Sequence, residues 1–96
     1  MIKGKTKRGF AFEVNESVGK DFRIVIATKQ LNSEDTLEKV EGTYNFVEAI
    51  LGKAGVDELV KFVIKETGFA DTEIVLSEAK EILSFVSENS EEVKKS

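Results

Sequence analysis

Hydrophobic and polar residues alternate in the first 14 positions of the chain. Phe10, Phe12 and Val14 fall on one face of an extended segment, and a looser alternation covers residues 2–6. The intervening turn ends in Gly9, a residue that tolerates the positive φ of a tight turn. The pattern predicts a β-hairpin over residues 2–14. An isolated hairpin is only marginally stable in water, so we expect its apolar face to pack on the helices or on another subunit.

Residues 18–31 fit two patterns equally well. A helix would align one stripe, which consists of Phe22, Val25, Ile26 and Lys29. A strand would align a different set, which consists of Phe22, Ile24, Ile26 and Thr28. The many β-branched residues favour the strand. The residues alone therefore leave this segment open between helix and strand.

Helical periodicity is clear from residue 33 onward. Polar residues that suit a helix start occupy positions 32–35. They precede an apolar stripe that consists of Leu37, Val40, Tyr44, Val47 and Leu51. Gly42 interrupts this stripe and costs about 1 kcal/mol relative to Ala inside a helix, so we expect a break or bend near Gly42 and Thr43. Gly52 is predicted to end the helix.

Two further helices follow. The first has the stripe Val56, Leu59, Val60, Val63 and Ile64. Gly68 is predicted to close it, and Phe69 to pack back on its last turn. The second is capped by Asp71 or Thr72 and has the apolar face Val75, Ala79, Ile82, Leu83 and Val86. We predict one domain over residues 1–88, mainly α, with the N-terminal β-hairpin packed on a bundle of three to four helices. Residues 89–96 are predicted to form a flexible tail.

The composition excludes several kinds of chemistry. The 96 residues include no His and no Cys, so Ser–His and Cys–His nucleophile pairs, zinc sites with those ligands and disulfides are ruled out within the chain. Its adjacent carboxylates, such as Asp57 and Glu58, fit first helical turns or polar surface better than acid–base catalysis. No apolar run approaches the roughly 20 residues that span a bilayer. We expect no enzymatic activity, cofactor, metal or membrane partner.

Charge is distributed unevenly. The net charge is −4, yet the first nine residues carry four cations and no acid. This basic patch is either a solvated edge of the hairpin or a docking site for an acidic surface. An acidic chain with so few clustered cations is a poor nucleic-acid binder. Ile74, Leu76 and Phe85 lie outside the main stripe of the last helix and suggest self-association through that helix or the hairpin. The candidate partner-binding residues are Lys3, Lys5, Lys7, Arg8, Phe10, Phe12, Ile74, Leu76 and Phe85.

Three stretches resemble a group of small phage proteins from Gram-positive hosts. Residues 4–16 resemble their opening, which has the order Gly-x-Thr-x-Ser-Gly-Phe-x-Phe-x-Val-Asp/Asn-Glu. Ile50-Leu51-Gly52 and the amphipathic segment after Gly55 resemble their second half, and residues 81–83 with the charged end also fit. These proteins are the tail assembly chaperones of long-tailed phages and prophages.

The resemblance implies a mostly helical chain over residues 18–88, including a helix within residues 18–31. It implies binding to the tape measure protein until tail tube protein polymerises around it, in the host cytoplasm. A homo-oligomer without enzymatic activity is expected. The alternative is a non-enzymatic regulatory adaptor or interaction module of a phage or mobile element. A tape measure gene just downstream would favour the chaperone.

Overall fold

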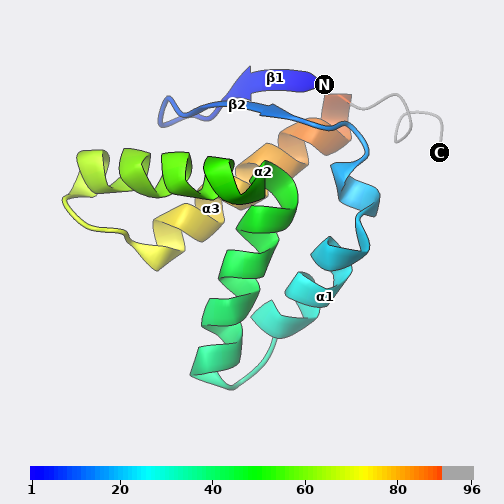
Figure 1. The fold of residues 1–96 in the computed structure, drawn as a ribbon, viewed down its shortest axis with the longest axis vertical. Coiled ribbons are helices and arrows are strands. Elements are labelled where there is room, and N and C mark those ends of the chain that lie inside the picture. The colour runs from blue at the N-terminus through cyan, green and yellow to red at the C-terminus, as the bar shows by residue number, and fades with distance from the viewer. Residues whose placement is uncertain (90–96) are drawn as a thin grey trace.

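The computed structural model describes residues 1–89, in which an N-terminal hairpin is followed along the chain by three α-helices (Figure 1). Its elements in chain order are β1 (Ile2–Lys5), β2 (Ala11–Val14), the short 3₁₀ helix η1 (Val18–Lys20), α1 (Phe22–Leu31), α2 (Thr36–Thr67) and α3 (Thr72–Asn89). The predicted mainly α fold with an N-terminal hairpin is confirmed. The predicted tail began at residue 89, which is the last residue of α3, and its remaining positions lie outside the described residues.

The hairpin forms as the alternation predicts. β1 and β2 pair antiparallel, with Gly4 opposite Phe12. The Thr6 N–H donates to the Phe10 carbonyl at 2.9 Å, and Gly9 adopts a φ of +105° in the turn. Phe10, Phe12 and Val14 are buried, so the predicted face is the one that packs on the helices.

Residues 22–31 form a helix, as the resemblance implied, but its buried face is not the predicted stripe. Ile24 and Ala27 are buried, whereas Phe22, Val25 and Ile26 face solvent. The Asp21 carboxylate starts the helix by accepting the Arg23 N–H at 2.8 Å. A stripe shows only that one side of a helix is apolar, and here the opposite side packs on α2.

The break in α2 lies at Gly52 rather than near Gly42. Gly52 has φ +77° and ψ 171°, and it separates two helical halves, residues 36–51 and 53–67. Gly42 is helical and buried where α1 crosses closely, because a Cβ there would lie 2.7 Å from Cβ of Gln30. The predicted break at Gly42 was wrong, since this glycine permits close helix packing instead of ending the helix. The predicted ends at Gly52 and Gly68 are confirmed.

One core cluster joins the hairpin, α3 and both halves of α2, and it extends to Ile24 and Ala27 of α1. The rings of Phe10 and Phe62 lie 5.4 Å apart between centroids, as do those of Phe12 and Phe85. Asp71 caps α3 by accepting the N–H groups of residues 73 and 74. Phe69 was predicted to pack back on α2, but it is exposed, and the Thr67 hydroxyl contacts the Phe69 carbonyl instead.

Candidate partner-binding surfaces

The basic turn of the hairpin is docked on α3 of the same chain. Nε of Arg8 lies 3.6 Å from Oε1 of Glu78, and the Lys7 N–H donates to Oε2 of Glu81 at 2.8 Å. Glu78 is only 2% exposed, and its Oε2 has no hydrogen-bond partner within residues 1–89. The acidic surface that the sequence suggested is therefore provided by α3 for the Arg8 side chain, whereas Lys7 bonds to α3 through its backbone only and its side chain is exposed.

Lys3 and Lys5 lie on β1, outside the turn, and differ from Arg8 in having no ion pair with α3 among residues 1–89. Nζ of Lys3 lies 4.0 Å from Oε2 of Glu13 across the hairpin, and both side chains are exposed, so this pair contributes little to stability. Lys5 is exposed beside the end of α3 and lines a shallow hollow there with Phe85 and Glu88. These two lysines remain accessible to a partner.

The apolar members of the predicted set contribute to the packing of the chain itself. Phe10 and Phe12 are each 7% exposed, and Phe12 meets Phe85 edge to face. Ile74, Leu76 and Phe85 are half-buried and pack against the core. Because these rings pack against helices of the same chain, the apolar face of the hairpin is covered without a partner subunit. Little of this apolar surface is left for another protein.

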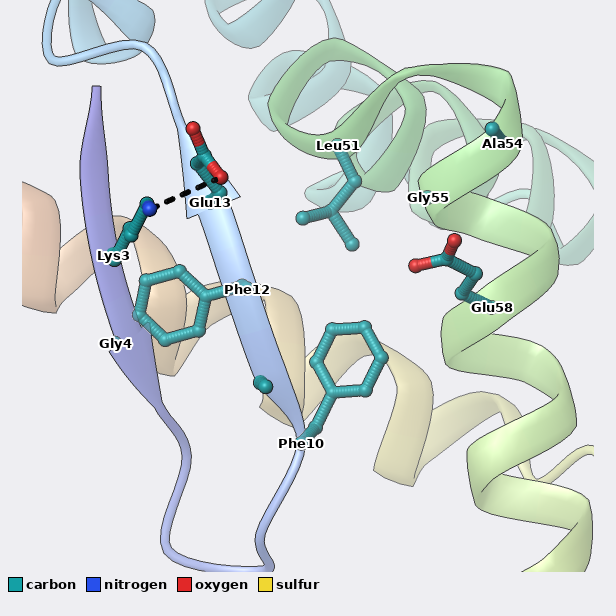
Figure 2. Close-up of a pocket in the computed structure, with 10 residues that line it drawn as sticks. Lys3, Gly4, Phe10, Phe12, Glu13, Leu51, Ala54, Gly55 and Glu58 are labelled. Atoms are coloured by element: carbon teal, nitrogen blue, oxygen red, sulfur yellow. Dashed lines mark ion pairs between the residues drawn. The ribbon is translucent and has the colours of Figure 1, made fainter.

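A groove runs beside β2 (Figure 2). Its volume is about 550 Å³. The hairpin forms one side, and Leu51, Ala54, Gly55 and Glu58 of α2 form the other side, which we call the α2 wall. Figure 2 shows Leu51 and Glu58 reaching from that wall toward the hairpin, with Phe10 and Phe12 on the near side. Ala54 and Gly55 also line the α2 side; the small side chain of Ala54 leaves space, whereas the place of a Cβ at Gly55 is taken by Leu51, whose Cβ would lie 2.5 Å away.

Most of the large exposed apolar side chains lie elsewhere, on α1 and the first half of α2, and the others among residues 1–89 are Met1, Ile64 and Phe69. Phe22 is 73% exposed, Leu37 76% and Tyr44 50%. The remaining members of the set on α1 and the first half of α2 are Val25, Ile26 and Val40. We call the six together the apolar face, and it has two parts: Phe22 and Ile26 border Asn45 and Glu48, whereas Val40 and Tyr44 border Val56 and Val60. The predicted helical stripes contained all six residues. The periodicity of the sequence identifies these residues as one apolar side of a helix, but it does not show whether that side is buried or exposed to solvent.

A second, smaller groove adjoins the apolar face where α2 bends. It holds about 190 Å³ and is lined by residues of both α2 halves and the start of α3, among them Val40, Tyr44, Val56, Val60, Ala70 and Val75. We call it the elbow groove. Glu48, as acceptor of a hydrogen bond from the hydroxyl, raises the pKa of Tyr44, and the negative charges of Glu48 and Asp57 add to this effect. The rim of this apolar groove is therefore acidic.

The described residues contain no group of three or more acidic side chains that could hold a metal ion. Within residues 1–89, no helix is long and apolar enough to cross a membrane. Comparison of the sequence and structure with models of known protein families, with curated proteins and with solved structures gave no match.

Proposed function

We propose that this chain is a non-catalytic tail assembly chaperone, which binds an apolar, helical segment of a tape measure protein until tail tube protein polymerises around that client. The observation that carries the proposal is the apolar face together with the elbow groove. Exposed apolar patches rimmed by polar residues are typical of protein interaction sites. The resemblance of residues 4–16 and 50–60 to this family names the client.

The spacing of the apolar face suits a helical client. Val25 and Ile26 lie three and four residues after Phe22, and Leu37, Val40 and Tyr44 follow one another at intervals of three and four residues. Partner helices are commonly bound by apolar side chains at this spacing beside a groove. Burial of apolar surface contributes about 25 cal/mol per Å², so six large side chains provide a substantial driving force.

Co-expression with a tape measure protein from the same genome tests the proposal. The wild-type chain should raise the soluble fraction of the client. The double variant Val40→Ser/Tyr44→Ser should lower that fraction to the level seen without a chaperone. Ile64→Ser is the matched control, because Ile64 is also exposed on α2 but does not line the elbow groove. A client that is equally insoluble with and without the wild-type chain would contradict the proposal.

We also propose that the chain self-associates, as a protein that covers a long client requires. The exposed apolar face is the surface available for it, since the hairpin rings are buried. Sedimentation of wild-type protein from micromolar to millimolar concentration should show a growing mass. The variant Phe22→Ser should reduce this growth, and a strictly monomeric wild type would argue against self-association.

A further inference from the structure

The outer edge of β2 carries unpaired backbone hydrogen-bonding groups. Thr6 and Phe10 form a hydrogen-bonded pair at the end of the hairpin, and the register continues through Gly4 opposite Phe12. Hydrogen-bonded and non-hydrogen-bonded pairs alternate along an antiparallel ladder. The N–H and C=O groups of Ala11 and Glu13 therefore point away from β1. An edge of this kind is a template for another strand.

This edge faces the groove of about 550 Å³ and not open solvent alone. Ala11 and Glu13 line it from β2, and Ala54, Gly55 and Glu58 line it from α2 (Figure 2). Adjacent strands lie about 4.8 Å apart, so a strand added to β2 would run between the hairpin and the α2 wall. The small, exposed side chain of Ala54 in that wall leaves room for the backbone of such a strand.

The charges of the groove indicate the side chains of its occupant. Glu58 is exposed in the α2 wall and has no ion pair among residues 1–89. Glu13 has only the loose contact of 4.0 Å to Lys3. Lys3 also lines the groove and offsets the charge of Glu13, so the unpaired carboxylate of Glu58 is what favours an occupant with a lysine or arginine directed at the α2 wall.

We propose that the β2 edge binds an extended, basic segment of a partner protein as a third strand of the hairpin sheet. The occupant is a partner segment and not the β2 strand of a second copy. In each copy β2 is flanked by β1 on one side and by the α2 wall on the other, so it cannot enter the same groove of its neighbour. This site is separate from the apolar face and does not depend on the proposed function.

Selection from a displayed library of random heptapeptides tests the inference, with wild-type protein as bait and Ala11→Pro as the counter-selection bait. Proline at position 11 removes the outward N–H but leaves the pairing with β1 intact, because proline is tolerated at a strand edge. Selected peptides should contain alternating β-branched residues and a lysine or arginine. Ala11→Pro should bind them about tenfold or more weakly than wild type does, because the added strand loses a backbone hydrogen bond that also fixes its register on β2.

Lys5→Pro is the matched control. Lys5 lies opposite Ala11 in the register, and its N–H points outward from the other edge of the hairpin, so the selected peptides should bind this variant as tightly as wild type. Glu58→Gln should weaken binding several-fold and remove the preference for a basic residue, whereas Glu66→Gln, outside the groove, should change neither.

Ala54→Arg tests the groove without altering the sheet. It fills the α2 wall and places a cation one helical turn from Glu58, so it should abolish peptide binding while the circular dichroism spectrum stays that of wild type. Ala54→Arg still tests the proposed strand binding if Ala11→Pro does not fold. The inference is overturned if no peptide distinguishes wild type from Ala11→Pro, or if the selected peptides bind Ala54→Arg as tightly as wild type.

Discussion

The two halves of the molecule use their apolar residues in opposite ways. The hairpin, the second half of α2 and α3 form a closed unit in which Phe12, Leu59 and Ile82 are buried. α1 and the first half of α2 pack on each other through Ile24, Ala27 and Phe46 but present a second apolar side to solvent. Both halves contain regular apolar stripes. The comparison shows that a stripe can indicate a core in one half and an interaction surface in the other.

Matched truncations of one phenylalanine in each half should give the largest difference. Phe12→Ala removes a buried ring that packs edge to face on Phe85, and it should cost about 3–5 kcal/mol in the free energy of unfolding. Phe22→Ala removes a ring that is 73% exposed and should change the same quantity by less than about 0.5 kcal/mol. Urea denaturation of both variants measures the contrast. Equal losses would show that Phe22 belongs to a core.

The difference between the halves explains which features could be predicted from the sequence. In β2 the residues that alternate with the phenylalanines are Ala11 and Glu13, so only one face can be the core. In α1 both faces are apolar, so periodicity cannot choose between Phe22 with Val25 and Ile24 with Ala27. That choice depends on the approach of α1 to Gly42, which is a contact between distant positions.

The groove beside β2 and the buried Glu78 were also beyond sequence reasoning. The groove lies between β2 and residues on both sides of the bend at Gly52, so it depends on how distant segments pack, which is a tertiary property. Glu78 falls three residues after Val75 on the buried side of α3, yet an acid there has no local signal of burial. Its pairing with Arg8 joins residues that are far apart in the chain.

Gly42 offers a test of the packing between α1 and α2. An alanine is favoured over glycine by about 1 kcal/mol in an exposed helix. A Cβ at position 42 would lie 3.0 Å from the backbone nitrogen of Leu31, which cannot yield as a flexible side chain can. Overpacking costs about 1–3 kcal/mol, so after the gain in helix propensity Gly42→Ala should lower the free energy of unfolding by up to about 2 kcal/mol. Thermal and urea denaturation measure the sign, and a stabilised variant would contradict the close crossing.

The contact between Arg8 and Glu78 tests how the closed half holds its turn. Arg8→Ala leaves a buried carboxylate without its cation, and because Arg8 is itself half exposed we expect a loss of about 1–2 kcal/mol. Glu78→Met replaces the carboxylate by an apolar side chain of similar size and should be neutral or stabilising. Denaturation of both single variants and the double variant measures the coupling. A large loss in Glu78→Met would show that the ion pair itself stabilises the fold.

The smallest effect concerns the start of α1, in the open half. The pKa of Asp21 is lowered to about 2, chiefly by the hydrogen bonds from the Arg23 side chain to the Asp21 carboxylate and then by the Arg23 N–H bonded to the same carboxylate. A carboxyl group with a lower pKa in the folded state stabilises that state above its unfolded pKa, and the contribution is lost as pH falls through the folded value. The start of α1 should therefore loosen between about pH 4 and pH 2, while the buried packing of the closed half does not depend on this group. Asp21→Asn keeps a side-chain oxygen for the helix cap but removes the titrating charge. Amide and carboxyl chemical shifts followed from pH 5 to pH 1.5 should show a midpoint near 2 for Asp21 and a coupled change at Arg23. In the Asn variant the change at Arg23 should disappear. A midpoint for Asp21 near the usual value for an aspartate would show that Arg23 does not hold this carboxylate in solution.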